Sequence, residues 1–200
     1  MRRELKKGIV NITAGIAVVV LLRVLVVFSS FVQHIDQALY AIVISFRTTV
    51  LTTFMRGVTV IGLEGIVAVG IAFLGFFLLQ RRYTLVVRLA ALLVGTYIAQ
   101  DATKLFFNVP RPPISYWLVA ESSSSFPSGH ALGATVLFGF IYWLIARSGV
   151  HRFVCWSAYS VAIVIIFLVG LSRIYLGVHW PSDVIAGWIL GFFWLRAVLR

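Results

Sequence analysis

The sequence predicts an all-α integral membrane protein whose spanning helices form one bundle. Apolar residues make up 61% of the 200 residues and charged residues only 12%, which is about half of the roughly 25% that soluble domains carry. A soluble core of this size could not hide so much apolar surface, so the excess must face lipid. The apolar residues also gather in stretches of about 20, the length that a spanning helix needs. The single cysteine, Cys155, excludes a disulfide scaffold, and the apolar content excludes a disordered chain.

The first apolar stretch, residues 8–32, follows a basic cluster at residues 2–7. Such a charged start is typical of a signal peptide, but this stretch is too long and no convincing small-residue cleavage site follows it. We therefore expect it to stay in the protein as a membrane anchor. Arg23 interrupts the stretch and is expected to snorkel to the interface or to face the protein.

Residues 33–56 mix apolar and polar side chains, which predicts an amphipathic helix lying along the membrane interface. This segment could be a movable lid or a fixed interfacial helix. The second span is expected over residues 57–79 and the third over residues 84–99. Glu64 lies within the second span, where a carboxylate is costly, so we expect it to pair with a cation or to support a functional site.

A loop rich in proline and serine is expected over residues 105–127, and Glu121 could be a solvated residue of that loop. The remaining spans are expected over residues 129–146, 153–171 and 183–199. The prediction is thus six spans. No internal repeat or long linker divides the chain, so residues 1–200 are predicted to form a single membrane-embedded domain.

The distribution of lysine and arginine predicts the orientation of the bundle. With six spans and the N-terminus inside, both termini are cytoplasmic and most of the cations lie on the inner side, as the positive-inside rule requires. The inner cations are Arg2, Arg3, Lys6, Lys7, Arg81, Arg82, Arg88, Arg147, Arg152, Arg196 and Arg200. The outer cations are Arg47, Arg56, Lys104, Arg111 and Arg173. Topology therefore accounts for the net charge of +11, and no nucleic-acid partner is expected.

The polar residues concentrate in three segments that this topology brings to the outer side, residues 104–112, 126–130 and 172–183. Their candidate site residues are Lys104, Arg111, Ser128, Gly129, His130, Arg173, His179 and Asp183. Three permanent cations that converge would repel one another unless an anion lay between them. The planar fork of arginine suits phosphate oxygens, and the N–H groups that begin the fourth span would add an anion seat.

Two histidines complete this set. One imidazole could attack phosphorus and the other could protonate the leaving oxygen. Asp183 lies four residues after His179 and could orient its ring, as the carboxylate of a serine-protease triad does. No group of histidines, cysteines and carboxylates has the spacing of a metal site, so we expect no metal and no cofactor. The cationic side chains could stabilise transition-state charge instead.

The same residues resemble the signatures of a known family. Lys104 to Pro112 reads K-x6-R-P, residues 127–130 read P-S-G-H, and Ser172 to Asp183 contains S-R-x5-H-x3-D. All three patterns are complete and in order, and they resemble the motifs of the type 2 phosphatidic acid phosphatase (PAP2) superfamily. The six-span pattern is similar to the integral-membrane bacterial branch of that family, although the N-terminal third matches in architecture only.

The resemblance implies a role for each residue. His179 would be the nucleophile and form a phosphohistidine, and Asp183 would orient it. His130 would protonate the leaving group and then activate water. The residues that would hold the phosphoryl oxygens are Lys104, Arg111, Ser128, Gly129 and Arg173.

The implied function is that of a metal-independent lipid phosphatase in a bacterial inner membrane, with its active site at the outer face. Undecaprenyl diphosphate is the first expected substrate, because that carrier is released on the outer side. Phosphatidylglycerol phosphate, phosphatidic acid and lipid A are the alternatives. A phosphotransferase could use the same site. A transporter is disfavoured because Arg23, Glu64 and a few Ser and Thr are the main polar residues in the spans. The oligomeric state stays open.

Overall fold

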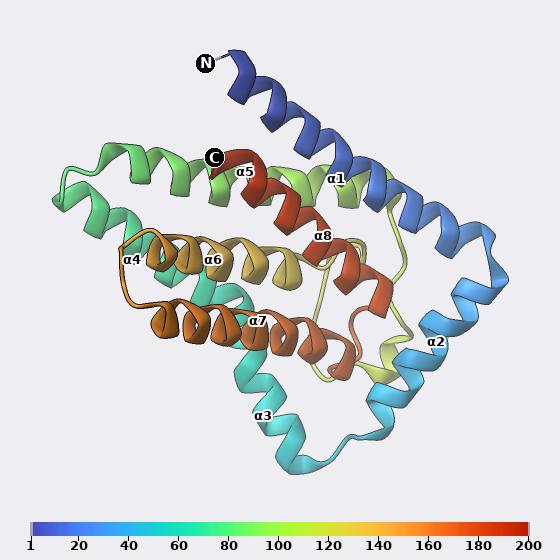
Figure 1. The fold of residues 1–200 in the computed structure, drawn as a ribbon. Helices are drawn as coiled ribbons and strands as arrows, with labels where there is room; N and C mark the ends of the chain where they lie inside the picture. The colour runs from blue at the N-terminus through green and yellow to red at the C-terminus, as the bar shows by residue number, and fades with distance from the viewer. Residues whose placement is uncertain (1, 200) are drawn as a thin grey trace.

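A computed structural model describes the backbone of residues 2–199 and the side chains of residues 6–62 and 64–199. The described chain is helical, with loops and no strand (Figure 1). Its elements are α1 (Arg2–Phe28), α2 (Ser30–Ser45), α3 (Thr49–Val60), the π-helical turn η1 (Ile61–Gly65), α4 (Ile66–Leu79), α5 (Tyr83–Phe107), the 3-10 turn η2 (Ile114–Tyr116), α6 (Gly129–Ala146), α7 (Arg152–Tyr175) and α8 (Pro181–Val198). This confirms the predicted all-α class.

Four helices are long and apolar enough to cross a membrane by themselves. They are α1 from Lys6 onward, α5, α6 and α7, and the bent pair of α2 and α3 would make a fifth if it is one broken span. The apolar helix α4 is shorter, and α8 begins with Pro-Ser-Asp and carries Arg196, which lowers its apolar character. The number of six spans therefore stays a prediction.

The structure corrects the prediction of one interfacial helix over residues 33–56. The chain there forms two helices, α2 and α3, which meet at an angle of 116°. Thr48 begins the second helix as its N-cap, because its hydroxyl accepts a hydrogen bond from the Leu51 backbone N–H at 3.2 Å. Arg47 holds the bend in place by donating to the carbonyl oxygen of Tyr175 at 2.9 and 2.7 Å.

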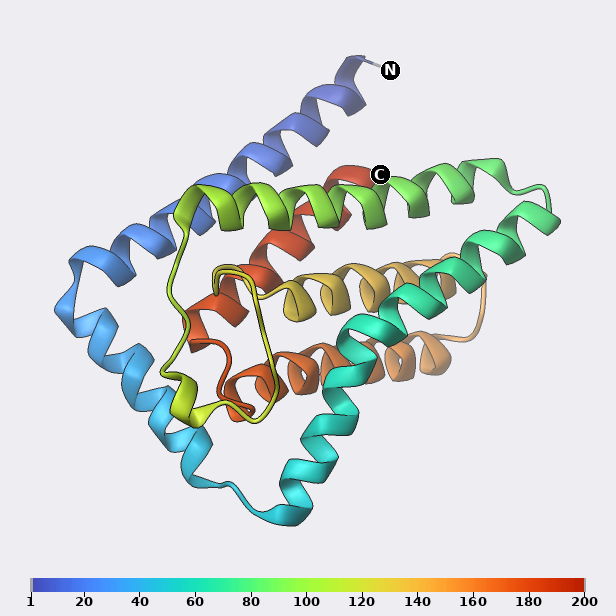
Figure 2. The same cartoon turned by 180° about the vertical axis from the view of Figure 1, so that it is seen from behind.

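Helix α6 is the centre of the bundle and packs against α5, α7 and α8 (Figures 1 and 2). Its residues from Ala131 to Leu137 are all buried, and Phe140 joins Phe77 and Leu89 in an apolar cluster. Helix α1 packs along the outside of α8. The small residues at the start of α6 allow α8 to pack closely against it, and this packing holds the first turn of α6 in place.

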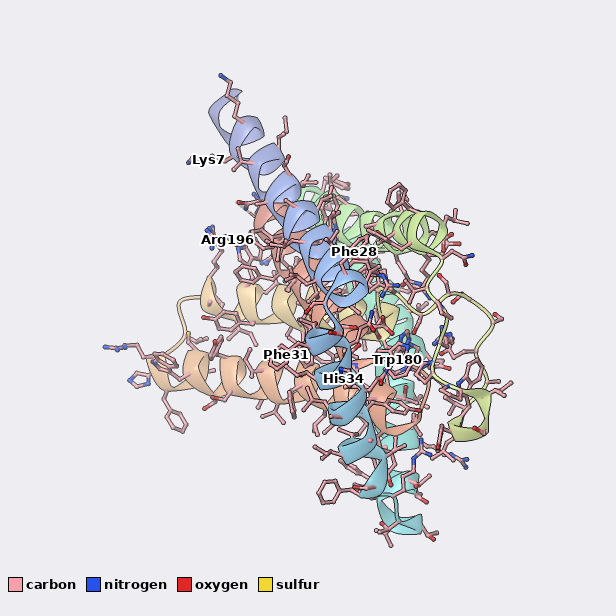
Figure 3. All side chains as sticks on the ribbon, turned by 90° about the vertical axis from the view of Figure 1, so that its right-hand side faces the viewer. Lys7, Phe28, Phe31, His34, Trp180 and Arg196 are labelled. Atoms are coloured by element: carbon pink, nitrogen blue, oxygen red, sulfur yellow. The ribbon has the colours of Figure 1, made fainter. Side chains whose placement is uncertain are left out.

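The two ends of the bundle differ. The termini and the links at 80–82 and 147–151 lie toward one end, whereas the long loop at 108–128 and the link at 176–180 lie toward the other (Figures 1 and 2). Figure 3 shows the α1–α2 elbow, where Phe28 and Phe31 are 83% and 72% exposed. Trp180, from the 176–180 link, lies beside α2, with its ring centroid 5.1 Å from that of Tyr40. The three polar segments therefore meet at the end away from the termini.

Candidate functional site

The three polar segments converge as the sequence predicts. Lys104 lies in the last turn of α5, Arg173 in the last turn of α7, and Asp183 in the first turn of α8. Ser128 is the N-cap of α6, Gly129 and His130 open that helix, and Arg111 and His179 lie in the adjoining loops. Arg173 and His179 are each only 1% exposed, and Ser128 and Asp183 are fully buried. Buried charges are costly unless they are paired, so the environment of each charge is informative.

One ring nitrogen of His179 contacts a carboxylate, and the other contacts an arginine. Its Nδ1 lies 3.4 Å from Oδ2 of Asp183, and its Nε2 lies 3.2 Å from a terminal nitrogen of Arg111. Because arginine can only donate, Nε2 must be the accepting nitrogen and Nδ1 must carry the proton. Asp183 is itself held by the Trp180 backbone N–H, which donates to Oδ2 at 2.8 Å. The lone pair of Nε2 therefore faces the cationic side of the site.

The surroundings of His179 favour its neutral form. Burial lowers the pKa of His179 well below its usual value of 6.5, and the positive charges of Arg111, Arg173 and Lys104 act in the same direction. A neutral imidazole has the lone pair that a nucleophile needs. The ring can therefore attack an electrophile at neutral pH without first losing a proton.

Ser125 is a member of the site that the sequence did not single out. Ser125 is fully buried, and its hydroxyl donates to Oδ2 of Asp183. The Oγ atom of Ser125 also lies 3.3 Å from Nδ1 of His179. The backbone N–H of Ser125 donates to the carbonyl of Val109 at 2.8 Å, which fixes this part of the loop. In the sequence it is one of four consecutive serines, and only its place just before the P-S-G-H motif could have marked it.

Both arginines of the site contact the same carboxylate. A terminal nitrogen of Arg111 donates to Oε2 of Glu121 at 3.1 Å, and one of Arg173 donates to Oε1. Burial lowers the pKa of Arg111, and the negative charge of Glu121 acts in the opposite direction. The expectation that Glu121 could be a solvated loop residue is therefore corrected, because its side chain is only 20% exposed and is held by the two guanidinium groups.

Other N–H groups of Arg111 and Arg173, together with the ammonium group of Lys104, hold the loops together. Nε of Arg111 donates to the Ser123 carbonyl at 2.8 Å, and Arg173 donates to the hydroxyl of Thr59 at 2.6 Å. Nζ of Lys104 donates to the Ser123 hydroxyl at 2.7 Å. Arg111, Lys104 and Arg173 thus draw α5, α7, α3 and the 108–128 loop around one centre.

Several buried polar atoms of the site lack a partner. Among the described residues, six buried side-chain atoms have none: Asn11 Nδ2, Thr96 Oγ1, Ser128 Oγ, Arg173 Nε, Asp183 Oδ1 and Trp188 Nε1. Half of these atoms belong to the site. Buried polar groups are normally hydrogen-bonded, so such a cluster indicates a place for a polar ligand. Two of the three, the Ser128 hydroxyl and the Arg173 Nε–H, are donors, which suits the oxygens of an anion.

The start of α6 is where the sequence predicts an anion seat. The Ser128 side chain makes no capping bond, and its backbone N–H donates to the carbonyl of Asp183 at 2.9 Å. The following N–H groups belong to the first turn, where a helix has unpaired donors and a positive dipole end. A side chain at Gly129 would require the Gln100 amide to move, because a Cβ atom there would lie 2.1 Å from Oε1 of Gln100.

Asp36 supports the site from α2, a role that the sequence did not predict. Its carboxylate accepts hydrogen bonds from the backbone N–H of Ser182 at 2.8 Å and from the Ser182 hydroxyl at 2.7 Å. These bonds hold the first turn of α8, which carries Asp183. Glu64, by contrast, is exposed in η1, and Lys104 donates to Ser123 rather than to any carboxylate among the described residues.

The π-helical turn η1 packs directly against His130. A Cβ atom at Gly62 would lie 2.9 Å from Cδ2 of His130 and 2.7 Å from Cγ1 of Val169. Such single π-helical turns within α-helices often occur at functional sites. The close approach means that the backbone at Gly62 sets the position of the His130 ring.

Gly62→Ala is expected to displace His130 and to lower the activity of the protein by about 10- to 100-fold, because small errors in position are costly at a reacting centre. It should also destabilise the fold by about 1–3 kcal/mol through overpacking. Gly57→Ala is the matched control, since a Cβ atom there meets nothing within 4 Å. Turnover and thermal unfolding of both variants test this, and full activity in Gly62→Ala would show that this glycine does not position His130.

The structure offers no obvious metal site. Among the residues that it describes, no group of three or more His, Cys, Asp and Glu side chains could hold a metal ion. His179 and Asp183 are engaged in hydrogen bonds with Ser125 and Trp180.

Comparison with known proteins places this arrangement in context. The sequence profile of the PAP2 superfamily matches residues 84–200. Phosphatidylglycerophosphatase B of Bacillus subtilis is 32% identical over 170 residues, which are 82% of this chain and 82% of that protein. An undecaprenyl-diphosphatase of Sulfolobus acidocaldarius is 41% identical over 86 residues, 42% of this chain and 36% of that protein.

A solved structure is also similar. The crystal structure of a transmembrane PAP2-type phosphatidylglycerolphosphate phosphatase from Bacillus subtilis superposes with a TM-score of 0.82 and 27% identity, covering 94% of each chain. These likenesses confirm the family resemblance that the three motifs predict. They also confirm the predicted all-α transmembrane class.

Proposed function

Since the chain belongs to the PAP2 superfamily, we propose that it is a lipid phosphatase that hydrolyses a phosphomonoester or diphosphate of a membrane lipid through a phosphohistidine. The observation that carries this proposal is the pairing of His179, with Nδ1 toward Asp183 and Nε2 toward Arg111. That pairing gives a neutral nucleophile aimed at a cluster of anion-binding groups. The proposed catalytic residues are His179, His130 and Asp183.

In the first step, Nε2 of His179 attacks phosphorus, and the bond from phosphorus to the leaving oxygen breaks. Protonated His130 gives its proton to that oxygen. Asp183 stabilises the positive charge that develops on the imidazole, as the carboxylate of a catalytic triad does. The phosphoryl oxygens bind to Lys104, Arg111, Ser128, Gly129 and Arg173.

In the second step, neutral His130 takes a proton from a water molecule, and the water oxygen attacks the phosphohistidine. The phosphorus–nitrogen bond breaks, His179 is regenerated, and inorganic phosphate leaves. Fixed cations and N–H groups near the developing charge can supply the electrostatic stabilisation that this chemistry needs. We therefore propose that the reaction needs no metal.

The names of the relatives support an order among the candidate lipids. The relative that covers 82% of this chain is named a phosphatidylglycerophosphatase, and this moves phosphatidylglycerol phosphate ahead of undecaprenyl diphosphate, which the sequence alone ranked first. Undecaprenyl diphosphate remains the second candidate, because a shorter stretch is 41% identical to an undecaprenyl-diphosphatase.

The proposed setting is a bacterial inner membrane, with one domain over residues 1–200. The site lies at the end of the bundle away from both termini (Figures 1 and 2). Since most lysines and arginines belong to the other end, the positive-inside rule supports cytoplasmic termini and an outward-facing site.

The test is phosphate release by the purified protein in detergent with EDTA present. Phosphatidylglycerol phosphate, undecaprenyl diphosphate and phosphatidic acid are offered side by side, with His179→Ala as the control. We expect EDTA-resistant release that the variant lacks, fastest with phosphatidylglycerol phosphate. No release from any of these lipids by folded protein would contradict the proposal, and transfer of phosphate to an added lipid alcohol in place of water would indicate a phosphotransferase.

A further inference from the structure

Glu121 holds the same donors that a phosphoryl group would need. Its two carboxylate oxygens are bound separately, Oε2 by Arg111 at 3.1 Å and Oε1 by Arg173. The side chains of these arginines are only 5% and 2% exposed, and the terminal nitrogens that hold Glu121 are the donors that a bridging anion would use. Nε is the one nitrogen of the Arg173 guanidinium group that has no partner among the described residues. A phosphate that binds the same terminal nitrogens of both guanidinium groups must therefore displace the Glu121 carboxylate.

We propose that Glu121 is an internal competitor that sets a threshold for anions entering the phosphate site. The inference rests on the proposed function and deepens it by naming the substrate class: phosphoryl groups that carry two negative charges. Displacing Glu121 costs every anion the same free energy. Anions whose own binding free energy is smaller than this cost do not bind, whereas anions that bind more strongly still do. The weak binders that matter are phosphodiester headgroups, which fill any phospholipid membrane.

The charges explain which anions pass this threshold. A phosphodiester carries one negative charge on two free oxygens, and so does the carboxylate that it would replace. Replacing the Glu121 carboxylate by a phosphodiester therefore gains little binding free energy. A terminal phosphate carries up to two charges on three oxygens, and its third oxygen can accept from the unpaired Ser128 hydroxyl or Arg173 Nε–H. A dianion thus gains contacts that Glu121 does not make.

The loop geometry allows the carboxylate to leave. Glu121 borders a cavity of about 560 Å³, which is also lined by Arg111, Trp117 and the serines 122–124. The neighbouring residues Ser122 and Ser123 are exposed. The backbone of the loop is anchored nearby, since Leu118 N–H donates to the Leu176 carbonyl at 2.9 Å. Rotation of the Glu121 side chain into this cavity would free both arginines while the loop stays in place.

The test compares Glu121→Gln with the wild type in binding inorganic phosphate and dimethyl phosphate, a monoanion that models a phosphodiester. Dissociation constants come from 31P NMR titrations of the full chain in detergent at pH 8. A neutral amide binds arginine less strongly than a carboxylate does, so we expect both probes to bind about 10-fold tighter to the variant. Phosphate release by Glu121→Gln should also fall as phosphatidylglycerol is added, whereas wild-type release should change little.

The matched control is Glu64→Gln, the same substitution at an exposed carboxylate whose charge acts on Arg173 but which is not among that arginine's hydrogen-bond partners. It should bind both probes like the wild type. Equal tightening in both variants would overturn the proposal, because the effect would then be one of general charge. Unchanged or weaker binding in Glu121→Gln would also overturn it, since Glu121 would then hold the arginines in place for the substrate.

Glu121→Asp is the second variant, in case the glutamine variant fails to fold. It keeps the charge, but its shorter side chain cannot bridge both arginines, so it should also bind both probes more tightly. Failure of the proposed function would be seen separately, as wild-type protein that releases phosphate from no lipid. The NMR titrations need no turnover, so they test Glu121 in either case.

Discussion

His179→Ala is expected to reduce phosphate release by about 10⁴-fold or more. The substitution removes the proposed nucleophile while leaving the cations that are proposed to bind the phosphoryl group, and loss of a covalent catalyst in comparable sites has effects of this size. Initial rates with phosphatidylglycerol phosphate in detergent measure the loss. Because His179 is buried at the centre of the site, thermal unfolding of the variant must be recorded beside its activity.

Two further measurements separate a nucleophile from a structural histidine. Added imidazole should partly restore phosphate release by His179→Ala, since it can enter the space left by the ring and accept the phosphoryl group. Asp183→Asn should retain the fold but lose about 10²- to 10⁴-fold, because an amide no longer stabilises the charged imidazole. A His179→Ala variant that stays folded and keeps more than about a tenth of the wild-type rate would rule out His179 as the nucleophile.

The candidate site could be predicted where a residue's role depends on local pattern. Lys104, Arg111 and His179 belong to short motifs with fixed spacing, and their convergence requires only that three helix ends meet at one end of the bundle. The start of α8 at Pro181 follows from a helix-start preference that is visible in the sequence. Ser128 occupies the N-cap position of α6, where serine is common, although its side chain makes no capping bond.

The residues that the sequence missed act through tertiary contacts. Glu121 and Ser125 lie in one loop. The path of this loop is set by backbone hydrogen bonds to Val109 and Leu176 and by the two arginines that contact Glu121. Nothing in their neighbourhood of serines indicates which hydroxyl or carboxylate turns inward. Asp36 reads as one polar residue of a mixed segment, and only its packing against Ser182, far along the chain, reveals its role.

The helix boundaries within residues 33–56 were predicted wrongly for a related reason. Hydropathy reports how apolar a stretch is, but it does not report whether the helix bends. Residues 33–56 were therefore expected to form one helix, whereas the break after α2 depends on Arg47, whose donors are taken by carbonyl oxygens of Tyr175 and Tyr116. A cation that bonds to carbonyls of distant residues can fix a bend that its own sequence neighbours do not predict.

His130→Ala is expected to separate the two chemical steps when a lipid diphosphate is the substrate. The first step then expels a phosphate monoester, a weakly basic group with a pKa near 6, so it hardly needs a proton from His130. The second step still needs a base to activate water, and loss of a general base costs about 10²- to 10⁴-fold. Phosphohistidine should therefore accumulate until nearly every His130→Ala molecule carries one.

The accumulation depends on the leaving group, and this gives the experiment its control. Phosphatidylglycerol phosphate expels a basic alkoxide, so with that substrate His130→Ala should be slow in the first step and should accumulate little intermediate. Undecaprenyl diphosphate labelled with 32P at its terminal phosphate should label the single variant after an alkaline quench, and the double variant His130→Ala/His179→Ala should stay unlabelled. Slow turnover of the diphosphate without any labelled protein would mean that no phosphohistidine forms or that His130 does not serve its hydrolysis, and the two-step mechanism built on these histidines would fail.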